Sequence, residues 1–119
     1  MSNSNIEVLE RELNNVTGQG KILDALQTYY ADDCTFQEGT GGIRDSKQAQ
    51  HNYLASFFKT LKAFNGATLH GQAVGPDLSA SEWTFDMTGG DGKRMVWNEV
   101  LVRRWRNGKV VSEKFYQAS

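Results

Sequence analysis

The 119-residue sequence contains one cysteine, one proline and two histidines. A single cysteine, Cys34, excludes an internal disulfide and is typical of proteins from a reducing compartment. No apolar run is long enough to span a bilayer, and residues 1–5 lack the charged and apolar regions of a signal peptide. A cytoplasmic protein is therefore expected.

The sequence also lacks an excess of charge of either sign. Its 13 Lys and Arg residues against 14 Asp and Glu residues give a net charge of −1, with both signs interspersed. This balance provides no electrostatic reason to bind nucleic acid or an anionic membrane, so neither partner is expected. The length predicts one domain, residues 1–119, with a core of its own.

The most informative segment is a C-terminal hairpin. Residues 94–106 and 109–116 are rich in Val, Trp, Phe and Tyr, which favour strands, and Asn107-Gly108 lies between them. An Asn-Gly pair between two such runs predicts a tight two-residue turn. Counting back from this turn places Trp105 opposite Val110 and Arg103 opposite Ser112.

Three segments in the first half of the chain show helical periodicity. In the first, Ile6, Leu9, Leu13 and Val16 recur at three- and four-residue intervals. Before the third, Asp45 is followed three residues later by Gln48, as in a capping box. The expected helices are residues 5–16, 21–30 and 46–63.

Five segments read as strands, and glycine-rich or polar segments separate them. Three helices can cover only one face of the resulting sheet, and a curved sheet leaves a conical hollow beneath them. The sequence therefore predicts an α+β fold, a cone-shaped barrel with three N-terminal helices in the concave face of a curved, mostly antiparallel sheet. The expected strands are residues 34–38, 67–75, 79–88, 94–106 and 109–116, with a turn at 31–33 and a loop at 39–42.

Two segments, residues 29–33 (YYADD) and 105–111 (WRNGKVV), carry a family resemblance. With this order of elements, the chain resembles the SnoaL-like branch of the nuclear-transport-factor-type superfamily. That superfamily includes ketosteroid isomerases, polyketide cyclases and limonene epoxide hydrolases. The resemblance implies a shared fold and pocket, but a single fold supports unrelated reactions.

Similarity to ketosteroid isomerase implies specific roles for two residues. Glu38 stands where that enzyme has its general base, and Tyr53 resembles the helix-three tyrosine that supports the oxyanion hole. The oxyanion donors themselves are absent, because their positions fall at Asn14 and at Val100 or Leu101. Loss of these donors removes what is usually the largest catalytic contribution, which argues against steroid isomerisation.

The chemistry of the candidate residues leaves alternatives. The apolar residues around Glu38 would raise its pKa toward neutrality and suit it to proton transfer; otherwise Glu38 is a solvated carboxylate beside a glycine loop. His51 is an acid, base or hydrogen-bond donor in the pocket, or a surface histidine like His70. The histidines lack metal-ligand spacing, so neither a metal nor another cofactor is expected.

Two opposite faces of the hairpin compete for the pocket. Anchoring the resemblance on residues 108–111 points Glu113 and Phe115 inward, together with Asn98 and Val100. Arg104 and Glu113 are then close enough to pair across the strands. The other face carries Trp97, Trp105, Tyr116 and Arg103, a composition typical of protein interfaces, so a homodimer through the outer sheet face is expected.

On the preceding strand the two criteria disagree. Apolarity places Trp83, Phe85 and Met87 inward, whereas similarity to the isomerases places Glu82 there with Ala80 and Thr84; we follow apolarity and keep Glu82 in reserve.

The sequence thus predicts a hydrophobic pocket for a small apolar molecule bearing oxygen. The expected function is a cofactor-independent isomerase, cyclase or hydrolase in which Glu38 transfers a proton and His51 or Tyr53 polarises the substrate. The alternative is a non-catalytic module for ligand binding or dimerisation. The expected ligand-binding residues are Tyr30, Phe36, Phe57, Phe58, Trp83, Asn98, Val100, Glu113 and Phe115.

Overall fold

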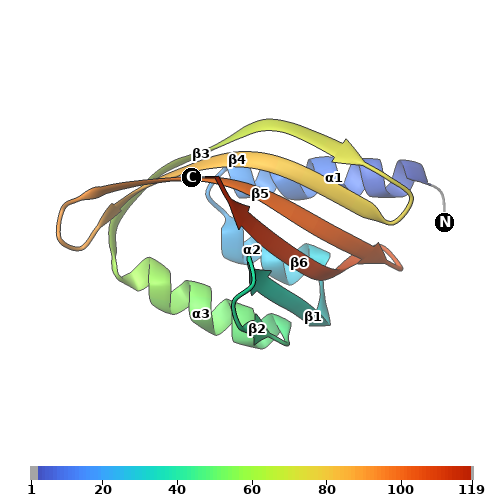
Figure 1. Ribbon diagram of the computed structural model, residues 1–119, viewed down its shortest axis with the longest axis horizontal. Coiled ribbons are helices and arrows are strands. Elements are labelled where there is room, and N and C mark those ends of the chain that lie inside the picture. Colours follow the sequence, from blue (N-terminus) through green and yellow to red (C-terminus); the bar gives the residue numbers. More distant parts are fainter. Residues whose placement is uncertain (1–2, 119) are drawn as a thin grey trace.

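The computed structural model describes residues 3–118. It contains three helices on one side of a curved sheet, which confirms the expected α+β architecture (Figure 1). The helices are α1 (Asn3–Gly18), α2 (Ile22–Tyr29) and α3 (Lys47–Lys59). The strands are β1 (Tyr30–Glu38), β2 (Ile43–Arg44), β3 (Leu61–Val74), β4 (Leu78–Gly89), β5 (Arg94–Arg106) and β6 (Lys109–Gln117).

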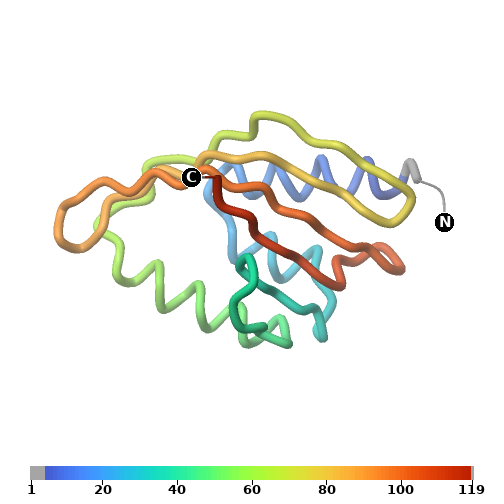
Figure 2. Tube along the Cα trace, viewed as in Figure 1, coloured from blue at the N-terminus to red at the C-terminus, as the bar shows by residue number. Residues whose placement is uncertain are grey.

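The six strands form one open sheet in the order β2-β1-β6-β5-β4-β3. All neighbours are antiparallel except β1 and β6, which run parallel. Long β3, β4 and β5 arch over the helices, and α1 lies along β3 and β4 (Figure 2). The sheet does not close into a barrel, and its concave face is the one that the helices cover.

Three local predictions need correction. Ser46, not Asp45, caps α3, and its Oγ accepts a hydrogen bond from the backbone N–H of Ala49 at 3.0 Å. Helix α3 also ends earlier than expected, because the chain from Leu61 onward pairs with β4. The expected turn at residues 31–33 lies within β1, at the point where the register with β6 shifts between Tyr30 and Thr35.

The predicted hairpin turn is confirmed. Asn107 and Gly108 adopt φ angles of 53° and 76°, the left-handed region that this pair tolerates. Next to the turn, Trp105 lies opposite Val110 as expected.

One residue further, the predicted register is wrong. A bulge between Arg104 and Trp105 places Arg104 opposite Ser112 and Arg103 opposite Glu113. A one-residue shift moves every later side chain of one strand to the other face relative to its partner. Glu113 and Phe115 therefore share the inner face with the odd-numbered residues of β5, not with Asn98 and Val100.

The inner face of the sheet forms two apolar clusters with the helices. One joins α1 and α2 to β1 and β6 around Leu13 and Val110, both fully buried. The other surrounds Trp83, Phe85 and Met87, so apolarity assigned the face of β4 correctly. Among residues 3–118, no helix has the length and apolar character needed to cross a membrane.

Candidate functional site

A cavity of about 130 Å³ lies between the helices and the concave face of the sheet. Every helix and every strand except β2 contributes to its wall, which is mostly apolar and rich in aromatic side chains. Phe57 stacks on Trp97 with ring centroids 5.4 Å apart, and Phe58 meets Phe64 edge-on at 6.3 Å. A cavity of about 150 Å³ is enough to hold benzene, so this one suits a small apolar molecule.

Glu99 of β5 brings a carboxyl group into this apolar wall. Among residues 3–118, no group donates a hydrogen bond to it or forms an ion pair with it, so the carboxyl faces the open cavity. Burial raises the pKa of Glu99 to about 7, and the negative charges of Glu38 and Glu113 add to the shift. Near neutral pH this group can therefore both accept and donate a proton.

Glu38 lies at the rim of the cavity, where β1 ends. Its Oε1 accepts a hydrogen bond from Nη2 of Arg44 at 3.1 Å, and its side chain is 54% exposed. The same guanidinium lies over the ring of Tyr53, 3.9 Å from the centroid, and its Nε donates to Gln50 at 2.5 Å. Burial, followed by the charge of Glu38, raises the pKa of the Tyr53 hydroxyl.

The floor of the cavity is a buried charged network centred on Arg103. Nε of Arg103 donates to Glu113 at 2.7 Å, and Nη1 donates to Glu10 at 3.0 Å and to Asn14 at 2.7 Å. Tyr30 also donates its hydroxyl proton to Glu113. Two carboxylates and one guanidinium thus meet away from solvent, joining α1 to β5 and β6.

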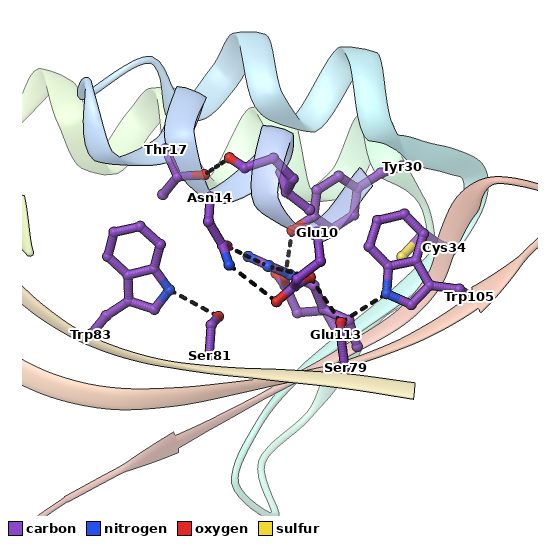
Figure 3. Close-up of polar contacts among 12 residues, drawn as sticks. Glu10, Asn14, Thr17, Tyr30, Cys34, Ser79, Ser81, Trp83, Trp105 and Glu113 are labelled. Carbon is purple, nitrogen blue, oxygen red and sulfur yellow. Dashed lines mark hydrogen bonds and ion pairs between the residues drawn. The ribbon is translucent and has the colours of Figure 1, made fainter. Parts of the chain in front are cut away.

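Further donors complete the environment of Glu10. Asn14 donates to it at 3.1 Å, and Ser79 at 2.8 Å while accepting a hydrogen bond from Trp105 (Figure 3). Burial opposes the charged form of Arg103, but the surrounding negative groups, Glu113 and Glu10 among them, raise its pKa above the usual value. Arg103 therefore stays protonated at any pH at which the protein is folded.

Eight of the residues expected at the site lie in the cavity wall, although their roles stay predictions. They come from α3, β1 and β6. They are Tyr30, Phe36, Glu38, Tyr53, Phe57, Phe58, Glu113 and Phe115.

Four other expected residues lie outside the cavity wall. Asn98 and Val100 belong to the outer face of β5, because the bulge changes the register, and Asn98 accepts a hydrogen bond from Thr84. His51 lies on α3 and accepts a hydrogen bond from Gln27 at 3.3 Å. Trp83 is fully buried but packs against the end of α1 at Gly18, beyond the cavity.

Sequence reasoning missed the central residues of the site. Glu99 and Arg103 were assigned to the outer face, because the bulge leaves no clear local signal. Glu10 carried a signal that went unused: it lies on the same helical face as Ile6 and Leu13, where a charged residue implies a buried partner. Within residues 3–118, no three His, Cys, Asp or Glu side chains are placed to hold a metal ion.

The sequence matches the SnoaL-like domain family over residues 11–113, and it matches no curated protein. A crystal structure of a candidate SnoaL-like polyketide cyclase from Mesorhizobium loti is similar, with 26% identity and a TM-score of 0.84. The alignment covers 93% of this chain and 97% of that one.

Two further solved structures share the fold at lower identity. An NTF2-like protein of unknown function from Burkholderia pseudomallei is 16% identical with a TM-score of 0.80, over 99% of this chain and 92% of that one. A ketosteroid isomerase-like protein from Catenulispora acidiphila, in complex with trimethylamine, is 16% identical with a TM-score of 0.71. That alignment covers 85% of this chain and 78% of the other.

Proposed function

Because this chain belongs to the SnoaL-like family, we propose that it is a cofactor-independent enzyme acting on a small, apolar, oxygen-bearing compound. The reaction we favour is an isomerisation or cyclisation that begins with removal of a proton from carbon, and Glu99 is the base. One observation carries this proposal: among the described residues, the carboxyl group of Glu99 has no protein partner and faces an aromatic-lined cavity.

The electrostatics of the cavity suit this role. A base with a pKa near the working pH combines a useful ionised fraction with a good driving force for proton transfer. Burial and the charge of Glu38 place the pKa of Glu99 at about 7. Glu38, paired with Arg44 at the rim, thus contributes by tuning Glu99, and it remains the second candidate for the base.

The cavity wall supplies the binding energy. Its aromatic side chains can bury an apolar ligand in more than one orientation, because apolar contacts are not directional. Burial of apolar surface contributes about 25 cal/mol per Å² to binding. The Catenulispora protein of similar fold was solved in complex with trimethylamine, which supports binding of a small organic molecule.

Proton transfer can be tested before the natural substrate is known. Phenylacetone has methylene protons acidified by both the ring and the carbonyl, and their exchange in D₂O is visible by proton NMR. We expect the protein to accelerate this exchange over buffer. The Glu99→Gln variant, which keeps the shape but cannot accept a proton, should lose the acceleration by about 100-fold or more.

The matched control is Glu82→Gln, which changes an exposed carboxylate on β4. This variant should accelerate the exchange of phenylacetone as much as the unmodified protein does. Equal exchange by the Glu99→Gln variant would exclude Glu99 as the base. Exchange no faster than in buffer, with phenylacetone bound, would favour the alternative function of a non-catalytic ligand-binding module.

We also propose that the protein works in the cytoplasm as a homodimer paired through the outer face of the sheet. The residues on that face differ from those expected, because the tryptophans and Arg103 point inward. The outer face carries aliphatic and aromatic side chains that are half-exposed or partly buried: Val96, Val100, Val102 and Tyr116.

A further inference from the structure

One nitrogen of the Arg103 guanidinium takes no part in the buried network. Nε donates to Glu113, and Nη1 donates to Glu10 and Asn14. Nη2 has no acceptor among residues 3–118, yet every fully buried polar side-chain atom in that range does have a partner. Since Arg103 is part of the cavity wall, its Nη2 must be reached from the cavity.

We infer that Nη2 of Arg103 binds the oxygen atom of the ligand, and that the ligand is a neutral carbonyl compound. This inference rests on the proposed function and names its substrate class. A guanidinium N–H group can only donate, so the ligand must present an acceptor at the floor of the cavity. The remaining wall is mostly apolar, so the rest of the ligand is apolar.

The charges around the cavity decide between a neutral and an anionic acceptor. Glu10 and Glu113 offset the charge of Arg103, and Glu38 and Glu99 add two more carboxyl groups to the wall. A carboxylate ligand would meet net repulsion there. Arg103 therefore contributes two directed N–H bonds rather than a free positive charge, which suits a ketone or an aldehyde.

This geometry places a donor where negative charge develops. When Glu99 takes a proton from carbon, the electron pair of the C–H bond moves through the carbonyl group, and the oxygen becomes an enolate oxygen beside Nη2. The proton returns from Glu99 to carbon, so no other reactant is required. Arg103 would thus supply the oxyanion stabilisation that Asn14, and Val100 or Leu101, do not supply at the positions of the missing donors.

Three probes of similar size and shape test the binding: acetophenone, ethylbenzene and benzoate. We expect acetophenone to bind the unmodified protein about tenfold more tightly than ethylbenzene, because one hydrogen bond from a charged donor contributes about that much affinity. Benzoate should bind more weakly than acetophenone. Nitrogen-15 NMR of the arginine side chains should show the Nη2 signal of Arg103 shifting with acetophenone and not with ethylbenzene.

The Arg103→Lys variant keeps the charge between the two glutamates but removes Nη2. It should lose about tenfold in acetophenone affinity while binding ethylbenzene as before, which also proves that the cavity is intact. Arg104→Lys, on the exposed outer face of the same strand, is the matched control and should change neither affinity. If Arg103→Lys does not fold, the probe series and the NMR shifts of the unmodified protein decide.

Equal binding of acetophenone and ethylbenzene, an unmoved Nη2 signal, or tighter binding of benzoate would each overturn the inference. Its failure is distinguishable from failure of the proposed function. Proton exchange that depends on Glu99 without a preference for acetophenone would remove the role of Arg103 alone. A preference for acetophenone without exchange would leave a carbonyl-binding protein that is not an enzyme.

Discussion

Arg103 and Glu113 lie directly opposite each other on β5 and β6, with Nε of the arginine 2.7 Å from the carboxylate. This pairing exists because the bulge beside Trp105 shifts the register by one residue. It turns both charges inward, beneath α1, where Glu10 completes the ion pairs. The pairing of Arg103 with Glu113 therefore determines which charged residues form the floor of the cavity and which residues remain on the outer face of the sheet.

Replacing Glu10 by alanine should destabilise the protein by about 3 kcal/mol, since it removes one partner of a buried ion pair and the acceptor of three buried hydrogen bonds. Chemical denaturation with urea measures this loss. Glu7→Ala, an exposed position on the same helix, should change stability by no more than about 0.5 kcal/mol. Similar losses for the two variants would show that Glu10 is not the buried partner of Arg103.

The pH dependence of stability should report on Glu99. Its pKa is raised from 4.5 to about 7 in the folded protein, so between these values the folded state binds more protons than the unfolded state. The contribution of Glu99 is therefore fully present below the unfolded pKa and is lost as the pH rises through about 7. Glu38, Glu113 and Tyr53 are the other titratable groups around it.

Urea unfolding at about pH 5 and about pH 8 measures this effect. The Glu99→Gln variant should be less sensitive to pH than the unmodified protein and more stable than it at the higher pH, by about 2 kcal/mol after allowance for partial exposure. Glu82→Gln, on the solvent side of β4, should keep the original pH profile. An unchanged profile for Glu99→Gln would contradict the raised pKa.

Glu38→Gln should lower the pKa of Glu99 toward its ordinary value, because it removes a negative charge that opposes ionisation of Glu99. Carbon-13 NMR titration of the glutamate carboxyl groups measures the shift directly. Lys114→Gln, a change at an exposed position on β6, serves as a control and should leave the pKa of Glu99 unchanged. If Glu99 titrated at the same pH with and without Glu38, the rim residue would have no tuning role.

The homodimer proposal predicts that a charge in the middle of the outer sheet face separates the subunits. Val100→Asp places an unpaired carboxylate among the aliphatic residues of β5, and desolvating it in an interface is costly. Sedimentation at micromolar concentration should show a dimer for the unmodified protein and a monomer for the variant. Val8→Asp, on the exposed side of α1, should remain dimeric. A monomeric unmodified protein would exclude the proposal.

Much of the fold could be predicted because it depends on local signals. The Asn107-Gly108 turn follows from two residues that tolerate positive φ, and the periodicity of Ile6 and Leu13 indicates α1 without any distant partner. Eight of the expected site residues lie in the cavity wall, and most of them belong to elements whose type was predicted correctly.

Local sequence did not decide which face of β5 points inward. Side chains alternate along a strand, so one extra residue on β6, Val111 opposite the step from Arg104 to Trp105, reverses the assignment of Asn98 and Glu99 relative to Glu113. Likewise, the pairing of β3 with β4 determined where α3 ends, against the helical pattern of residues 60–63.

The sequence by itself determined the element types, the hairpin turn and the aromatic character of the pocket, because short-range sterics and periodicity control them. Only the tertiary structure decided which charges meet. Glu10 and Arg103 are 93 positions apart in the chain, and desolvation allows them to be buried only together with Glu113 and Asn14. The same packing left Glu99 facing the cavity, where its surroundings rather than its position in the sequence set its chemistry.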